Sequence, residues 1–572
     1  MMKKAVVQIM ILLIAIPVIA QKKQDAELKR EVTLYNPYKP SLPDVVKKSY
    51  LPDMTDTSKV RPDFKYDIKT IAFMPVYNIT TIKPATLLPD ALPKLYNSFV
   101  KFGFGNYVSP LAEISITNER SKKGAIGLYA RHFSTHGNVE LQNLKKAYAG
   151  YMDNDVSVFG RRFLENSVFV SSVDLIQKTR YAYGYDTTFS DYEPSKKDIS
   201  LNYYNFGAQA GLVSQKLDSS TLSYDFKIDY NFFHSDVNFY QHNLGLKLSM
   251  NKSFMGFYVG SGIEYDYYKP SDSASVNSKY IFALTPFVRK SSAEWNLRLG
   301  VQLVADKEPE GSSKFHIYPD CNFSFGIVPT YISFFAGLTG KLENNQPLNV
   351  IGINPYVTPG KTIYNISNTD YTLIVRTGLT GATGIDGTYQ VSASYSVAND
   401  MLFFYNSILR DGVAVIQRGN YFMPLYDQAE ILNFHGEMGG KISSRFSLNA
   451  GADYYKYTLA NNDFAWNKPE WTANLGLKYN LRDKIIANIS LNAVGLRREL
   501  VTTTDISMLN TPVNQIINIP GNLSVNLGAE YRYTKILSFW FKLNNITFSR
   551  YYEWAFYPSQ RFIGLIGFTY SL

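Results

Sequence analysis

Cysteine is almost missing from this chain of 572 residues, in which Cys321 is the single cysteine. One thiol excludes an internal disulfide framework and a cysteine-rich zinc site. Long apolar runs are scarce too, because none after the first 20 residues reaches the ~18 residues that a membrane-spanning helix needs. The sequence therefore excludes a helical membrane protein.

Charge is also low, since Asp, Glu, Lys and Arg make up 19% of the chain. The formal net charge is +10, and loss of Lys3 and Lys4 with a leader would reduce it by two, to +8. Such an excess is modest for this length, and the sequence contains no dense basic cluster. Nucleic acid is therefore not a predicted partner.

Aromatic residues are abundant, with 44 Tyr, 36 Phe and 5 Trp, or 15% of the chain. Aromatic rings fit the pleated surface of a sheet, so this composition favours strands. A hydrophobic content of 45% is too high for a disordered chain.

The first 20 residues have the pattern of a cleaved signal peptide. Lys3 and Lys4 precede a short apolar stretch that ends in Val18-Ile19-Ala20, a small-x-Ala cleavage site. The alternative is a single membrane anchor, which the short stretch and its internal Pro17 disfavour. We expect export and a mature chain that starts at Gln21. The residue directly after the cleavage site is Gln21 and not a cysteine, so lipoprotein anchoring is excluded.

Several long segments alternate strictly between apolar and polar residues. In one of them, Leu475 belongs to the apolar set and Asn474 to the polar set. The clearest such segments are Leu222–Tyr230, Trp295–Leu303, Tyr389–Val397, Trp471–Leu481 and Leu523–Tyr533. A half-exposed soluble sheet alternates as well, but its strands are typically ~5–6 residues long. Segments of 9 to 11 residues, often ending in aromatics, instead predict a transmembrane antiparallel β-barrel.

The connections follow the layout of an outer-membrane barrel, with short turns on one side and long loops on the other. Short turns are predicted at Asn251–Ser253, Arg289–Ala293, Ala398–Asp400, Leu481–Lys484 and Thr534–Lys535. Long loops are predicted at Asp186–Ile199, Asp306–Ser313, Leu342–Asp370, Arg410–Gln428, Arg498–Pro520 and Arg550–Gln560. From Lys101 to the chain end we expect about 20 strands, within a range of about 18 to 22.

The chain end resembles the last hairpin of TonB-dependent-receptor barrels. The segments that carry the resemblance are Phe541–Thr547, Tyr551–Trp554 and Arg561–Leu572. Gly567, Tyr570 and Leu572 match the outer-membrane insertion signal of such barrels, although its last residue is usually aromatic. The opening hairpin around Phe102–Tyr107 resembles a plugless subgroup of that family. The resemblance implies an outer-membrane location, insertion by the barrel-assembly machinery and handling of a solute.

The segment before the barrel departs from the family, whose members carry a globular plug there. Residues 21–100 hold nine of the 25 prolines. Proline lacks the N–H donor that helices and sheets use. We therefore expect an extended segment and no globular plug, which puts energy-coupled import in question.

Candidate chemistry is sparse. His132 and His136 share a predicted strand face but lack further ligands at metal spacing. His435 with Glu437 suggests a hydrated lumen pair, and Asp153–Asp155 a weak calcium loop. No nucleophile stands beside a base, so we expect no enzyme, no metal and no cofactor.

Ten charged residues of the polar faces are predicted to line the lumen, five of each sign. They are Asp225, Lys227, Asp229, Lys247, Arg298, Glu437, Asp453, Lys478, Glu530 and Arg532. A balanced lining gives no basis for ion selectivity.

The leading hypothesis is solute binding or passage at the outer membrane. The alternative is a non-transporting barrel, the scaffold of a secretion or barrel-assembly complex. Predicted partners are outer-membrane lipid and the barrel-assembly machinery, with a periplasmic or surface protein as a further candidate. The extended segment would suit strand addition to such a protein.

Overall fold

The computed structural model describes residues 98–118, 123–189, 191–215, 221–236, 239–271, 276–309, 311–384, 386–507 and 511–571. The predicted leader, the proline-rich segment up to residue 97 and Leu572 lie outside the described residues. In the described part, no helix has the length and apolarity needed to cross a bilayer.

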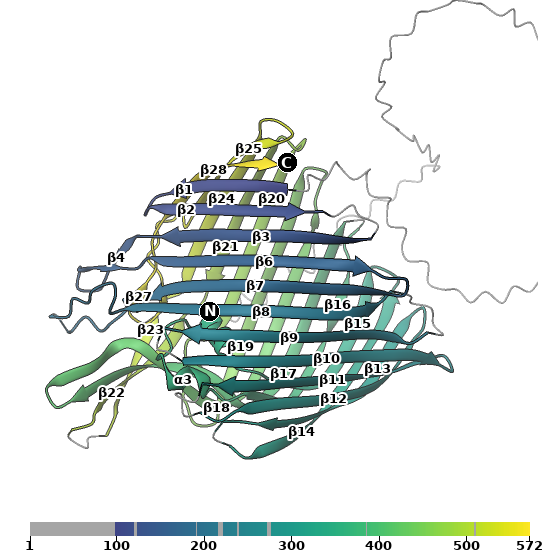
Figure 1. The fold of residues 1–572 in the computed structure, drawn as a ribbon, viewed down its shortest axis with the longest axis horizontal. Helices are drawn as coiled ribbons and strands as arrows, with labels where there is room; N and C mark the ends of the chain where they lie inside the picture. Colours follow the sequence, from purple (N-terminus) through teal and green to yellow (C-terminus); the bar gives the residue numbers. More distant parts are fainter. Residues whose placement is uncertain are drawn as a thin grey trace, which may run out of the picture. The chain divides into compact units, whose positions relative to one another are not determined.

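Most of the described strands form one large antiparallel barrel (Figure 1). The main sheet has 24 strands, and removing the β22–β23 hairpin leaves 22 in the barrel wall. The ring closes where β1 pairs with β28, Phe102 opposite Phe568. The predicted all-β barrel is confirmed, with a strand number at the top of the expected range.

The wall strands follow one another in chain order around the ring. Their bounds are β1 Ser98–Gly105, β2 Ser109–Thr117, β3 Gly124–Thr135, β6 Tyr151–Phe163, β7 Ser167–Tyr181, β8 Ser200–Ser214, β9 Ser223–Ser235, β10 Phe239–Phe254, β11 Phe257–Pro270, β12 Lys279–Ser291, β13 Trp295–Lys307, β14 Ser313–Val328, β15 Ile332–Glu343, β16 Thr369–Ala382, β17 Gly387–Asp411, β18 Ala414–Lys441, β19 Phe446–Leu459, β20 Trp471–Leu481, β21 Ile485–Val494, β24 Asn522–Arg532, β25 Leu537–Asn544 and β28 Ile563–Ser571.

Strand alternation gives the wall two chemically different faces. In β20, Leu475 lies opposite Ala450 and Leu491, whereas Asn474 lies opposite Gly451 and Asn492. Because successive side chains point to opposite faces, the apolar row faces outward and the polar row faces the lumen. An apolar exterior around a polar interior is the arrangement of a transmembrane barrel.

Three predicted connections are wrong. The predicted turn at 251–253 belongs to β10, and the chain turns at Met255-Gly256, both with positive φ. The predicted turn at 398–400 is an irregularity inside β17, where Asp400 has φ 52° and the register shifts. A polar Asn-Asp pair has the same sequence signature in a bulge as in a turn.

The third wrong connection is the long loop predicted at 410–428. It is part of a hairpin in which β17 has 25 residues and β18 has 28. The two strands continue to pair up to Asp411 opposite Ala414. The barrel also starts slightly earlier than predicted, with β1 beginning at Ser98.

The longer connections gather at one end of the barrel, on the left in Figure 1, which we call the loop end. They contain short elements: β4 Asn138–Glu140, β5 Lys146–Tyr148, α2 Pro347–Ile353, α3 Lys361–Tyr364, β22 Arg497–Asp505, β23 Val513–Ile519, β26 Tyr552–Trp554 and β27 Tyr557–Pro558. α2 has proline at its first position, where the missing N–H costs nothing. β22 pairs in parallel with the far part of β17.

Candidate functional site

Buried aromatic side chains pack together at the loop end. Tyr557 stacks on Tyr356 with ring centroids 3.8 Å apart and meets Tyr183 edge-on at 5.0 Å. Phe422 and Trp554 pack beside them with centroids 5.0 Å apart. These residues come from four distant parts of the chain, so the connections form one apolar core, which we call the aromatic seal.

Hydrogen bonds fix the seal in place. The Tyr557 hydroxyl donates to the Asn420 carbonyl oxygen at 2.5 Å, and the Tyr183 hydroxyl donates to that of Pro558 at 2.9 Å. Burial raises the pKa of both phenols well above the usual value. Both therefore stay neutral donors, which suits an apolar setting.

A polar cavity of 360 Å³ lies on the lumen face of β9 to β13, next to the chain that leads into α2. Its lining is rich in amides and carboxylates. The lining polar residues are Asp229, Asn231, Asn243, Lys247, Glu264, Asp266, Tyr268, Gln302, Asn344, Gln346 and Asn349. We call it the lumen cavity.

Strand register brings the acidic residues of the lumen cavity together. Asp229, Gly245 and Asp266 form one row across β9, β10 and β11. A Cβ placed on Gly245 would lie 2.5 Å from Asp229 Oδ1, so the Asp229 carboxylate lies over the glycine. In the next row, Lys247 Nζ lies 3.7 Å from Glu264 Oε2. A row with a carboxylate–lysine ion pair therefore lies beside a row whose two aspartates form no ion pair with any described residue.

The segment before α2 covers the lumen cavity. Asn344 donates to the Tyr268 hydroxyl, and Lys279 Nζ donates to Asn344 Oδ1 at 3.3 Å. Asn349 donates to the Asn344 carbonyl at 3.2 Å. The cover is thus attached to the wall by polar contacts at the cavity rim.

Two buried amides of the wall keep an acceptor free of any protein donor. Among the described residues, none donates to Asn243 Oδ1 or Asn205 Oδ1, although their side chains are 6% and 5% exposed. Asn243 lines both the lumen cavity and a smaller cavity of 50 Å³, which Asn205 also lines. Buried acceptors normally have a partner, so each of these atoms needs a donor from outside the described residues, either a water or a bound solute.

A second cavity of 490 Å³ lies between the loops beside Ile353 of α2. It is lined by Trp554, Arg497, Lys468 and Glu553 among others. Arg497 donates to the Glu553 carbonyl at 2.8 Å. Desolvation by the surrounding protein lowers the pKa of the Lys468 ammonium group. It raises the pKa of the Glu553 carboxyl, although that side chain is exposed to the cavity.

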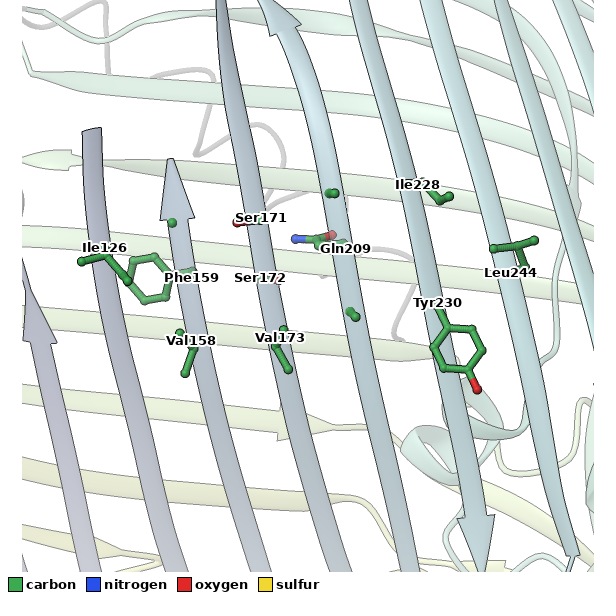
Figure 2. Close-up of a pocket in the computed structure, with 13 residues that line it drawn as sticks. Ile126, Val158, Phe159, Ser171, Ser172, Val173, Gln209, Ile228, Tyr230 and Leu244 are labelled. Atoms are coloured by element: carbon green, nitrogen blue, oxygen red, sulfur yellow. The ribbon is translucent and has the colours of Figure 1, made fainter. Parts of the chain in front are cut away.

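A third hollow, of 420 Å³, is a groove on the outward face of β6 to β10 (Figure 2). Bulky Val158, Val173, Ile228 and Leu244 surround it, and the small Ala210 contributes to its floor. Its outward position follows from the pairing of Ala210 with Ile228. The groove is apolar, as a lipid-facing surface requires.

All ten charged residues predicted for the lumen lie in wall strands, where they alternate with apolar neighbours. Of these, Asp229 and Lys247 line the lumen cavity. Several of them form ion pairs: Asp225–Lys227 at 3.4 Å, Lys247–Glu264 at 3.7 Å, Arg298–Asp320 at 2.7 Å and Glu530–Arg532 at 3.8 Å. Asp453 and Glu437 both contact the His435 ring, at 2.9 Å and 3.6 Å.

The other predicted residues are distributed as follows. Gly567 and Tyr570 lie in β28 on opposite faces, and Leu572 is outside the described residues. His132 lies in β3 and contacts Asn154 and Ser134, whereas His136 follows that strand and contacts Tyr148.

The calcium-loop hypothesis for 153–155 is wrong, because these residues lie in β6 and alternate between its faces. Within the described part of the chain, no group of three His, Cys, Asp or Glu side chains is placed to hold a metal ion.

Sequence reasoning missed Asp266, Asn243 and the cover at Asn344. Asp266 and Asn243 do belong to polar faces of alternating segments, so the pattern alone could have found them as lumen residues. Their proximity to Asp229 depends on the pairing of three strands, for which the sequence contains no local signal.

No family model matches the sequence, and no curated protein matches it either. Solved structures do match the fold. The FrpB iron transporter from Neisseria meningitidis superposes with a TM-score of 0.62 at 10% identity, covering 84% of this chain and 82% of that one.

Two further structures match at similar levels. The ferric-catecholate import receptor Fiu from K12 E. coli has a TM-score of 0.58 at 10% identity, covering 84% and 82% of the two chains. The copper transporter OprC has a TM-score of 0.59 at 11% identity, covering 83% and 80%. The chain therefore shares the barrel fold of this import receptor and these two transporters.

Proposed function

We propose that the protein is an outer-membrane receptor that binds a small polar solute in its lumen and admits it to the cell. The observation that carries the proposal is the lumen cavity, a polar pocket inside a barrel whose loop end is packed with aromatic side chains. Enclosed pockets with a few convergent polar groups are the usual form of small-molecule sites.

The fold neighbours support the same class of function, since their names describe import receptors and transporters. Their iron and copper cargoes belong to those proteins. We propose that the loops move during passage, because the aromatic seal packs connections from four parts of the chain together at the loop end. We propose an outer-membrane location, with lipid around the apolar exterior.

The test compares a strain that lacks the protein with the same strain carrying the wild-type chain or Asp229→Asn. Small solutes in periplasmic extracts are measured by mass spectrometry, and membrane fractions are probed for the protein. We expect at least one solute to fall in the deletion strain and to recover with the wild-type chain alone. An unchanged solute profile, or a protein absent from the outer-membrane fraction, would refute the proposal.

A second candidate is the scaffold function, which the hairpins beyond the wall favour. Among the described strands, β23 pairs with β22 alone, and Val413 and Val513 are 101% and 67% exposed at this extension. Exposed strand edges accept strands from partner proteins. Detergent pulldown should then recover a protein from wild type and lose it when Ile516 in β23 is replaced by Lys. Equal recovery from both would refute this role for β23.

A further inference from the structure

The lumen cavity has an excess of negative charge. Its ionisable lining consists of Asp229, Glu264, Asp266 and Lys247, which is three acids against one base. Lys247 pairs with Glu264, whereas Asp229 and Asp266 form no ion pair with any described residue. Asn231 Nδ2 donates a hydrogen bond to Asp229 Oδ2 at 3.2 Å. The neighbouring Lys279 is directed to Asn344 and lies over the Tyr268 ring at 5.0 Å.

The two aspartates face one gap, because Gly245 separates them in the strand row. The glycine has no side chain to fill this gap, and the Asp229 carboxylate leans over it. Two carboxylates at such a gap repel each other unless a positive charge lies between them. A cationic group of a solute that entered this gap would relieve the repulsion between the two carboxylates.

The amide of Asn243, which lines the lumen cavity, favours a ligand that also carries a hydrogen-bond donor. Asn243 Oδ1 is a buried acceptor without a donor among the described residues. Asn205 Oδ1 has the same status but lines only the smaller neighbouring cavity. Asn243 stands in β10 next to the Gly245 row, opposite Tyr268. A ligand that reaches this row from the aspartates would satisfy an acceptor as well as the charge.

The geometry points to a small organic cation that carries further N–H or O–H donors as the solute of the lumen cavity, and we propose this ligand class. The inference rests on the proposed receptor function and names its substrate class. A bare metal ion is disfavoured, since no group of three ligating His, Cys, Asp or Glu occurs in the described residues. A volume of 360 Å³ is at the lower end of the range of small-molecule sites.

The test is isothermal titration calorimetry of the purified full chain in detergent. The probe is spermidine, with sorbitol as a neutral polyol and succinate as a dianion of small size. We expect spermidine to bind and the other two to bind at least about tenfold more weakly, since an ion pair away from bulk water is worth about that factor. Sorbitol or succinate binding as tightly as spermidine would overturn the ligand class.

Substitutions test whether spermidine binding depends on the aspartates of the lumen cavity or on any acidic residue of the lumen face. Asp229→Asn and Asp266→Asn should each weaken spermidine about tenfold. Asp225→Asn is the matched control, because Asp225 lies on the same face of β9, pairs with Lys227 and is not part of the cavity lining. Equal loss in all three variants, or no loss in any, would overturn the site.

Failure here is distinguishable from failure of the receptor function. If the periplasmic measurement finds a solute that depends on the protein but is an anion, the receptor proposal stands and this inference falls.

Gly245→Ala gives an independent check that retains both carboxylates. Its Cβ would displace Asp229, so it should also weaken spermidine, and unchanged affinity would contradict the proposed gap.

Discussion

The two faces of β9 and β10 carry opposite chemistry within the same few residues. Outward, Ile228 and Leu244 border an apolar groove, which Figure 2 shows together with Tyr230. Inward, Asp229 and Asn243 line the lumen cavity. The two sets alternate along the same strands, so a shift of one residue in register would exchange them.

The outward groove and the lumen cavity need different side chains. The outward groove needs only apolar side chains of unequal size, because lipid is a fluid that fills any shape. The inward cavity also needs the cover from Asn344 and a glycine at a defined position in the row. The inward face should therefore be the more sensitive to small changes in shape and the outward face to charge.

The largest effect is expected for Gly567→Ala on the inward face of the closing strand. A Cβ there would lie 2.0 Å from the Phe102 carbonyl oxygen and 2.5 Å from the Trp540 ring. The β1–β28 backbones would have to separate, at more than the ~1–3 kcal/mol of an ordinary overpacked site. We expect the variant to lose the band of folded protein, which on electrophoresis changes position when the sample is heated.

Gly436→Ala is the control, since no heavy atom lies within 4 Å of its added Cβ. It lies on the outward face of β18, beside Val391. Equal folding of the two variants would mean that the close approach of β28 to β1 does not require glycine at position 567.

The second effect compares two neighbours in β20. Leu475→Arg places a charge on the lipid face and should cost about 2–4 kcal/mol near the bilayer midplane. Asn474→Arg places the same charge in the lumen, where the facing Gly451 leaves room. Folding yield in lipid vesicles measures both, and a better yield for Leu475→Arg would mean that the assigned faces are reversed.

The alternation in the sequence was sufficient to predict the barrel and the range of its strand number. It failed where polar residues interrupt a strand, as at Asp400, because a bulge and a turn share the same residue types. It also failed at 410–428, since strands beyond the membrane have no need for a regular apolar face.

The lumen cavity could not be predicted, because Asp229, Gly245 and Asp266 come from three strands. Periodicity assigns each residue to a face but not to a height along the barrel axis. The same applies to the aromatic seal, whose members Tyr183, Tyr356 and Tyr557 are separated by long stretches of chain. Their contacts depend on how long connections fold back, for which local patterns carry no information.

The third effect extends the comparison to a carboxyl group in an apolar place. Glu499 in β22 is fully buried and accepts a hydrogen bond from the Ala555 amide at 2.8 Å. Burial raises its pKa from 4.5 to about 8. The Glu499 carboxyl keeps its proton to a higher pH in the folded hairpin than in the unfolded chain. The free energy of unfolding of the hairpin is therefore greatest below about pH 4.5. It falls by about 1.4 kcal/mol per pH unit until about pH 8.

Glu499→Gln should remove this dependence, because glutamine resembles the protonated acid. Hydrogen exchange of the peptides that contain Glu499 and Ala555, corrected for intrinsic rates, measures the effect between pH 5 and pH 8. Wild type and variant with the same pH slope would show that Glu499 does not control the hairpin.

The smallest effect is expected in the outward groove. Ile228→Ala enlarges the groove and Ala210→Leu fills it. In a soluble core, Ile→Ala costs ~2–5 kcal/mol, because a cavity stays behind. In the wall, lipid chains are as apolar as the side chains and occupy the space in either variant. Both changes should therefore alter stability by less than about 1 kcal/mol in urea titrations of vesicle-bound protein, and spermidine affinity should not change. A core-like loss for Ile228→Ala would mean that protein, not lipid, covers this groove, and the groove would then be a docking surface on the outward face of the wall.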